Sequence, residues 1–252
     1  MLWGNIMPTP LTIIFPYYRQ PQMLAYQLAI WNIYPTEAQI ILVDDGSPEP
    51  AIDVIVQHAH PELFQHMQLY RIVEDVPWNR EEARNLGAGK AQTEWIVQLD
   101  LDHVLPVSSV QALLAYQSWR DRHYRFPRWR RGIADDTRRK DCLKDECPYG
   151  PIHPHMDSYL VRKEAYWQAG GYNEAFAGVL GGGSEFLTRL CAIVTWEVLP
   201  LNIPIEVITR FVVPDSSIST LSRDTEPGKA RWRALQGKKP TTWLVHPWER
   251  IL

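Results

Sequence analysis

Three short apolar segments near the start of the chain, each followed by a polar turn, constrain its fold most strongly. They span residues 11–15, 39–43 and 95–99. Continuous apolar runs of this length are typical of strands buried on both faces of a sheet. A helical pattern at residues 23–31 lies between the first two segments, so this part of the chain is predicted to be a right-handed βαβ unit. We therefore expect an α/β protein with a mostly parallel central sheet flanked by helices.

The alternation of helix and strand patterns continues along the chain. Residues 67–73, 192–198 and 205–213 are predicted to be strands, residues 158–165 a strand that runs into a short helix, and residues 51–59 and 108–119 helices. A further helix opens at about residue 79, where Asn79 suits the N-cap and Glu81 and Glu82 fall in the first turn.

Two carboxylates follow the apolar segment 95–99. Asp100 and Asp102 point the same way if the strand stays extended, because side chains of a strand alternate between its faces. Mg²⁺ and Mn²⁺ prefer oxygen ligands and commonly bind one or two protein carboxylates together with substrate phosphates. Since ligands of open α/β sheets lie at the carboxyl ends of the strands, this pair indicates either a site for a metal-bound nucleoside diphosphate or a solvated strand end, and the rest of the chain has to decide between them.

Composition narrows the classes of protein. The chain has 252 residues, of which 45% are hydrophobic and 22% charged, and this suits a globular protein with a sizeable core. A net charge of −3 gives no global reason to expect a nucleic acid as partner. No apolar run is long enough to span a membrane, and three cysteines are too few for a disulfide scaffold, so we expect a cytoplasmic protein.

Four segments occur in an order that resembles a known family. They are Thr12-Ile13-Ile14-Phe15-Pro16-Tyr17-Tyr18, Val43-Asp44-Asp45-Gly46-Ser47, Ala83-Arg84-Asn85-Leu86-Gly87 and Asp100-Leu101-Asp102. Together they resemble the nucleotide-sugar half of family 2 glycosyltransferases of GT-A fold. Nucleotidyltransferases share this architecture but usually carry a glycine-rich phosphate loop after the first strand, and residues 15–19 contain no glycine.

The resemblance implies a single GT-A (Rossmann-like nucleotide-diphospho-sugar transferase) domain over residues 1–252. Residues 8–105 would form the nucleotide-sugar half, and residues 106–252 the acceptor half with a C-terminal lid. It also implies that Asp100 binds ribose and metal and that Asp102 binds the metal. Pro16, Tyr18 and the pair Asp44/Asp45 would surround the base and ribose. Arg84 would lie near the nucleotide or its phosphates. The plainer interpretations are a turn or helix cap for Asp44 and a helix-surface arginine for Arg84.

The chain departs from the family pattern where the catalytic base is expected. Gly181-Gly182-Gly183-Ser184-Glu185 aligns with the family's acidic motif, but the usual Glu-Asp pair falls on Gly182 and Gly183. Glu185 is then the first candidate for the base. Three alternatives stay open: a base elsewhere (Asp157, Glu174 or Asp215) or a retaining reaction that needs none, a protein that binds a nucleotide sugar without transferring it, and a purely structural acid at a helix start.

Histidines and cysteines suggest further metal ligands. A late histidine completes the metal shell of several GT-A enzymes, and His246 is the candidate here, with packing between Trp243 and Trp248 as the structural alternative. Cys142, Cys147, His153 and His155 could hold zinc, although their spacing is looser than that of the usual Cys-x₂-Cys pairs.

A basic stretch and a polar stretch lie in the second half of the chain. Nine arginines and lysines against three aspartates occur at residues 120–140, interleaved with aromatic residues, and could bind an anionic acceptor or RNA. Residues 220–239 are polar and charged and could form a lid. The sequence favours an inverting, Mn²⁺- or Mg²⁺-dependent transferase that moves a sugar from a nucleoside diphosphate sugar to a hydroxyl acceptor. The rival hypotheses are a non-catalytic nucleotide-sugar-binding or scaffold protein and a polyanion- or RNA-binding protein.

Overall fold

The computed structural model of the chain describes residues 10–116, 119–131, 153–216, 224–235 and 237–252. Its elements, in chain order, are β1 (Leu11–Tyr17), α1 (Pro21–Trp31), β2 (Ala38–Asp44), α2 (Ala51–His58), the 3₁₀ helix η1 (Pro61–Gln65), β3 (Met67–Ile72), α3 (Arg80–Lys90), β4 (Trp95–Gln98), β5 (His103–Val104), α4 (Val107–Ala115), β6 (His123–Arg125), β7 (Arg128–Arg131), β8 (Tyr159–Arg162), α5 (Lys163–Gln168), the 3₁₀ helix η3 (Glu174–Phe176), α6 (Gly182–Cys191), β9 (Trp196–Val198), β10 (Ile205–Ile208), α7 (Glu226–Leu235) and β11 (Trp248–Arg250).

A large sheet organises the fold, with the strand order β11-β3-β2-β1-β4-β8-β6-β9. Its centre, β3-β2-β1-β4, is parallel, while β11 and β8 pair antiparallel with β3 and β4. Strands of the second half of the sequence therefore extend both sides of the sheet built by the first half. The predicted α/β fold with a mostly parallel central sheet is confirmed.

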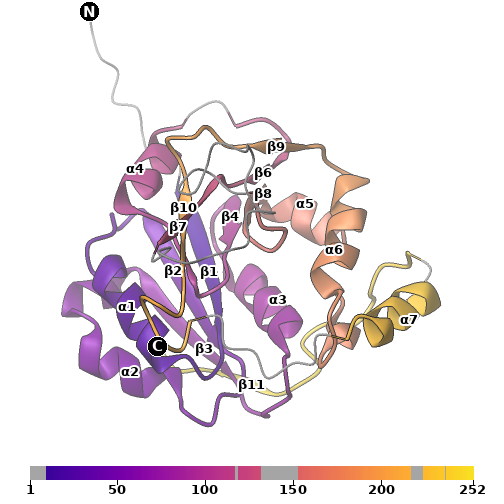
Figure 1. Cartoon of the computed structure of the whole chain (residues 1–252), viewed down its shortest axis with the longest axis horizontal. Coiled ribbons are helices and arrows are strands. Elements are labelled where there is room, and N and C mark those ends of the chain that lie inside the picture. Colours follow the sequence, from indigo (N-terminus) through magenta and orange to yellow (C-terminus); the bar gives the residue numbers. More distant parts are fainter. Residues whose placement is uncertain (1–9, 117–118, 132–152, 217–223, 236) are drawn as a thin grey trace, which may run out of the picture.

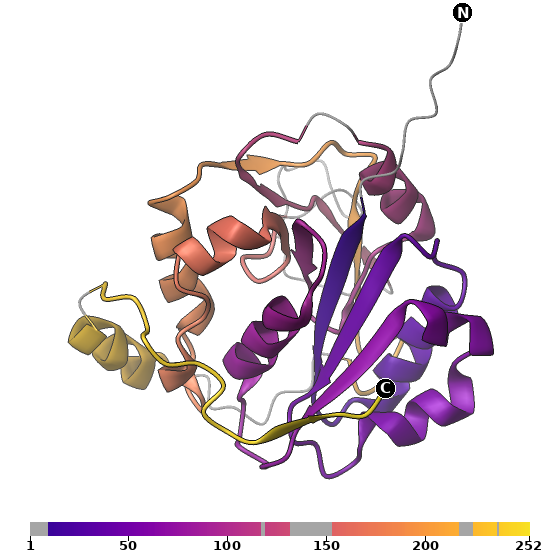
Figure 2. The same ribbon diagram turned by 180° about the vertical axis from the view of Figure 1, so that it is seen from behind.

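Helices cover both faces of this sheet (Figures 1 and 2). Leu11, Ile13 and Phe15 of β1 point into a core shared with α1, α2 and α4, whereas Ile14 points to the opposite face, where α3, α5 and α6 pack. This alternation follows from the two-residue period of a strand, and it explains why β1 is apolar throughout. Along this strand only Pro16 is partly exposed, at the carboxyl end.

The chain crosses from β3, on one side of β1, to β4 on its other side. The carboxyl ends of β1 and β4 therefore diverge at a topological switch point, where open α/β sheets form their ligand crevices. A smaller sheet has the strand order β5-β10-β7, and its first strand along the chain, β5, begins directly after Asp102. The topology thus places Pro16 and Asp100 next to one crevice.

Several predicted boundaries were wrong in the second half. Residues 192–195 are not a strand, because α6 continues to Cys191 and its last turn closes through bonds from Ala192 and Val194; only Trp196–Val198 is extended. The strand expected at residues 205–213 ends at Ile208. The described residues do not include the part of the basic stretch after residue 131. They also do not include Cys142, Cys147 and part of the polar stretch 220–239. Within the described ranges, no helix has the length and apolar character that crossing a membrane requires.

Gly87 allows α3 to pack closely against β1. A Cβ atom at this position would overlap Cγ2 of Ile14, whereas a Cβ on the nearby Gly89 would meet nothing closer than 3.9 Å. We expect Gly87→Ala to lower the free energy of unfolding by roughly 1–3 kcal/mol, because overpacking a buried contact forces the backbone to shift. Gly89→Ala, on the same helix, should raise it by about 0.5–1 kcal/mol through helix propensity. Urea unfolding of both variants checks this; equal effects of the two substitutions would contradict it.

Candidate functional site

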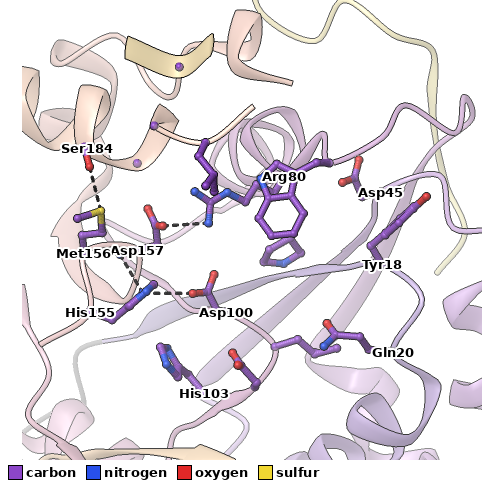
Figure 3. Close-up of a pocket in the computed structure, with 18 of the residues that line it drawn as sticks. Tyr18, Gln20, Asp45, Arg80, Asp100, His103, His155, Met156, Asp157 and Ser184 are labelled. Carbon is purple, nitrogen blue, oxygen red and sulfur yellow. Dashed lines mark hydrogen bonds and ion pairs between the residues drawn. The ribbon is translucent and has the colours of Figure 1, made fainter. Parts of the chain in front are cut away.

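A cleft of about 870 Å³ opens at the carboxyl ends of β1 and β4. Its volume lies in the range of sites for small ligands and cofactors. Figure 3 shows Tyr18 and Asp45 at one end of the cleft, Met156 and Ser184 at the other, and Asp100 between them. Of the residues predicted from the sequence, the cleft is lined by Pro16, Tyr18, Asp45, Asp100 and Asp102.

Asp45 and Tyr18 form one end of the cleft. Asp45 is 2% exposed, and its Oδ1 has no hydrogen-bond partner among the described residues. Burial, with the nearby charge of Glu81, raises the pKa of Asp45 well above its usual value. The Tyr18 hydroxyl donates to Oδ1 of Asp75 at 2.8 Å, so the phenol ring is held at the rim. This end therefore offers an aromatic ring to a ligand, with the carboxyl group of Asp45 buried in the wall beside it.

Asp44 does not line the cleft. Its Oδ1 accepts a hydrogen bond from the amide of Ser47, and its Oδ2 accepts one from the amide of Ala51, at the start of α2. Burial raises the pKa of Asp44 to about 6 in spite of these two bonds. The contacts are those of the turn and helix cap that was the plainer interpretation of this residue; its role in nucleotide binding stays a prediction.

Arg84 is fully buried beneath Asp100. Its Nη2 lies 2.5 Å from Oδ1 of Asp100, and its Nη1 donates to the backbone oxygen of Asp157 at 3.0 Å. Burial alone would raise the pKa of Asp100, but the charges of Arg84 and His155 outweigh it and hold that pKa below its usual range. Arg84 is therefore neither the surface residue of the plainer interpretation nor part of the cleft wall; it acts on the cleft by positioning Asp100.

Two histidines accompany Asp100. Nδ1 of His155 lies 3.2 Å from Oδ2 of Asp100, and the rings of His103 and His155 meet edge to face with centroids 5.1 Å apart. One ligand atom from each of Asp100, His103 and His155 can be chosen so that all three lie within 4.8 Å of one another. Burial and the neighbouring His155 lower the pKa of His103, so this imidazole is neutral and able to bind a metal. Asp102 lines the same cleft.

Asp157 and the half-buried Arg80 line the far part of the cleft, and Glu81 pairs with the same arginine without lining it. Oδ2 of Asp157 lies 3.0 Å from Nη1 of Arg80, and its Oδ1 accepts a hydrogen bond from the Tyr172 hydroxyl at 3.2 Å. Oε1 of Glu81 lies 3.3 Å from Nε of the same arginine. Burial raises the pKa of Glu81 to about 7, although Arg80 opposes this shift.

Glu185 lies away from the cleft wall, inside the protein. It is 1% exposed, and both of its oxygens pair with Arg189 one turn later, at 2.7 Å each. Arg189 also donates to the backbone oxygens of Ala169 and Gly171 and so ties α6 to α5. The contacts of Glu185 are thus those of the structural alternative, and its role as the base stays a prediction.

His246, the predicted metal ligand, contacts the carboxylate of Glu82. Its Nδ1 lies 2.5 Å from Oε2 of Glu82, and its backbone amide donates to Oε1 of the same residue at 2.8 Å. Both groups attach the segment before β11 to the first turn of α3. In this structure His246 is not part of the group formed by Asp100, His103 and His155; its role as a metal ligand stays a prediction.

Sequence reasoning left some cleft residues without a role. His103 directly follows the Asp-x-Asp motif, and that proximity could have marked it as a candidate ligand. The sequence suggests only zinc binding or acceptor contacts for His155, and it offers Asp157 only as one of several alternative bases. No local signal identifies Arg80, because its contact with Asp157 spans 77 positions of the chain.

The sequence pattern of glycosyl transferase family 2 matches residues 12–179. The matched range includes Pro16, Asp45, Arg84, Asp100 and Asp157, so it covers most of the cleft described above. The chain belongs to glycosyl transferase family 2.

Solved structures of glycosyltransferases share the fold. The mannosyltransferase PcManGT from Pyrobaculum calidifontis, in complex with GDP-Man and Mn²⁺, superposes with a TM-score of 0.56 at 16% identity, covering 80% of this chain and 57% of that one. TarS 1-349 of S. aureus superposes with a TM-score of 0.56 at 12% identity and covers 80% of this chain and 61% of that one. This family 2 chain thus has the GT-A fold and spans less than two thirds of each neighbour. Among curated proteins, none matches it.

The raised pKa of Glu81 predicts a pH-dependent contribution to stability. Because its folded pKa of about 7 lies above the unfolded value of 4.5, the folded state binds the proton more tightly, and this stabilisation is lost as pH rises through 7. Lowering the pH from 7.5 to 5.5 should stabilise the wild type by roughly 2 kcal/mol relative to Glu81→Gln, which cannot titrate. Urea unfolding at both pH values measures the difference. A stability difference that does not change with pH would contradict the prediction.

Proposed function

We propose that this family 2 protein transfers a sugar from a nucleoside diphosphate sugar to a hydroxyl acceptor. The observation that carries the proposal is the cleft at the switch point, where Asp100 lies next to two metal-capable imidazoles and Asp102 lines the same wall. A diphosphate carries several negative charges, and this wall is suited to hold them through a divalent cation.

The nucleoside fits the end of the cleft formed by Pro16, Tyr18 and Asp45. A base can stack on the Tyr18 ring, and Asp45 lies in the wall of the cleft at the same end. Because Asp100 lies farther along the cleft (Figure 3), the phosphates of a nucleotide bound this way would reach the metal-capable wall.

The donor set fits Mn²⁺ better than Mg²⁺. Asp100 offers carboxylate oxygen, whereas His103 and His155 offer imidazole nitrogen; Mg²⁺ prefers oxygen alone, and Mn²⁺ also accepts nitrogen. Asp100, Asp102 and these two imidazoles would hold the ion. When bound, the cation supplies Lewis acidity that offsets the negative charge of the leaving diphosphate.

The acceptor fits the opposite end of the cleft. Ser184 of α6 and Lys229 and Trp232 of α7 line it there, so the second half of the chain closes the cleft over the donor. This arrangement supports the division into a nucleotide half and an acceptor half with a C-terminal lid. Lys229 gives this end a positive charge that suits an anionic acceptor.

A thermal-shift panel tests the donor site. Nucleoside diphosphates and their sugars are added at about 100 times Kd, with Mn²⁺, with Mg²⁺ or without metal. One nucleotide with Mn²⁺ should raise Tm by roughly 5–10 °C, because ligand at that excess adds about 2.7 kcal/mol to the stability of the folded state. Asp102→Asn should abolish the Mn²⁺-dependent part of the shift.

Asp53→Asn is the matched control, since Asp53 is an exposed aspartate on α2 that does not line the cleft. It should leave the shift unchanged. If no nucleotide raises Tm with either metal, the transferase proposal is wrong. If a nucleotide sugar binds but no nucleoside diphosphate is ever released from it, the chain is a non-catalytic binding protein of this fold.

A further inference from the structure

Two glycines at the start of α6 lie against carboxylates that come from elsewhere in the chain. A Cβ atom on Gly182 would lie 2.9 Å from Cδ of Glu81, and a Cβ on Gly183 would lie 2.8 Å from Oδ2 of Asp157 and would overlap its Oδ1. No side chain fits at either position while these two acids are in place. The packing of Glu81 and Asp157 against the start of α6 therefore requires glycine at both positions.

By the resemblance described in the sequence analysis, these two positions align with the acidic pair of the family pattern. The space that those acidic side chains would enter is occupied here by the carboxylates of Glu81, on α3, and Asp157, in the segment before β8. The structure thus places two carboxylates beside the first turn of α6, although neither belongs to that helix.

We infer that Asp157 is the general base that deprotonates the acceptor hydroxyl, in place of the acid missing from Gly183. The inference rests on the transferase function proposed above. Of the two relocated acids, Asp157 lines the cleft and Glu81 does not. Glu81 acts as a positioning residue, because its carboxylate holds the Arg80 side chain that in turn pairs with Asp157.

The surroundings of Asp157 fix its carboxylate relative to the donor. Arg84 bonds at once to the Asp157 backbone oxygen and to the Asp100 side chain, so the base and the metal-capable wall share one rigid support. In Figure 3 Asp157 lies on the Ser184 side of Asp100, away from Tyr18 and Asp45. A sugar attached to the diphosphate would therefore lie between the nucleotide end and Asp157, with the acceptor beyond it.

The reaction step balances without any further reactant. Asp157 takes the proton of the acceptor hydroxyl as its oxygen forms a bond to the anomeric carbon of the sugar. The bond from that carbon to the diphosphate oxygen breaks on the opposite face, and its electron pair leaves with the nucleoside diphosphate. The configuration at the anomeric carbon is inverted, and the proton on Asp157 passes to solvent.

The test exchanges the acid between the two positions. The variants are Asp157→Asn, Gly183→Asp, and the double exchange Asp157→Gly with Gly183→Asp; Asp53→Asn serves as the control. The probes are GDP-mannose, UDP-glucose and UDP-N-acetylglucosamine with Mn²⁺ and with water as the acceptor. The readouts are the rate of nucleoside diphosphate release, the Kd of the donor, and the anomer of the freed sugar, measured by proton NMR before it equilibrates.

Asp157→Asn should lower kcat by about 100-fold or more, the usual contribution of a general base, and should change the donor Kd by less than about twofold. Gly183→Asp should also be inactive, because its side chain collides with Asp157. The double exchange removes the collision and returns a carboxylate to the same space. It should release nucleoside diphosphate at least about tenfold faster than either single variant, a non-additive gain expected of groups in contact.

Full activity of Asp157→Asn would overturn the inference, as would retention of the anomeric configuration by the wild type. So would a double exchange that folds and binds donor but is no faster than the single variants. These outcomes leave the transferase proposal intact, since the wild type is active in each. A wild type that neither binds nor cleaves any donor instead contradicts the proposed function, and the inference fails with it.

Discussion

The buried guanidinium of Arg84 is the contact on which the rest of the site depends. It joins α3, the end of β4 and the segment before β8 through bonds to Gln98, Asp100 and the Asp157 backbone. A buried charge is costly unless it is paired and hydrogen-bonded, so these three parts of the chain cannot separate without exposing an unpaired cation to the interior. The same charge keeps Asp100 ionised and ready for a cation.

The sheet topology makes this contact possible. Crossing from β3 over to β4 leaves a crevice between the ends of β1 and β4. Gly87 lets α3 lie close to β1, and this places Arg84, one turn earlier on the helix, beneath the crevice. A feature of backbone packing thus sets the position of a charge, and that charge holds the Asp100 carboxylate and the backbone of Asp157 in the wall of the cleft.

The first half of the fold could be predicted from the sequence because its information is local. Continuous apolar runs identified β1, β2 and β4, acids followed the last two, and the Asp-x-Asp motif identified one wall of the cleft. Glu185 and His246 were harder to place, because their contacts with Arg189 and Glu82 depend on packing that no motif encodes. The predicted ends of β9 and β10 were wrong for a related reason: backbone bonds of the neighbouring helix end and turn, from Val194 to Leu190 and from Val213 to Thr209, take the place of strand pairing.

Asp157 lies beside the first turn of α6 in space, although it belongs to the segment before β8 in the chain. An acid on the first turn of α6 would have the positive end of the helix dipole beside it. Asp157 lies against that same first turn, as its closeness to Gly183 shows, and also has the Arg80 guanidinium and the Tyr172 hydroxyl as partners. Moving the acid off the helix therefore keeps the helix terminus next to it and adds two partners. A motif search along α6 sees only glycines at these two positions, whereas the cleft presents the carboxylate of Asp157 beside the start of that helix.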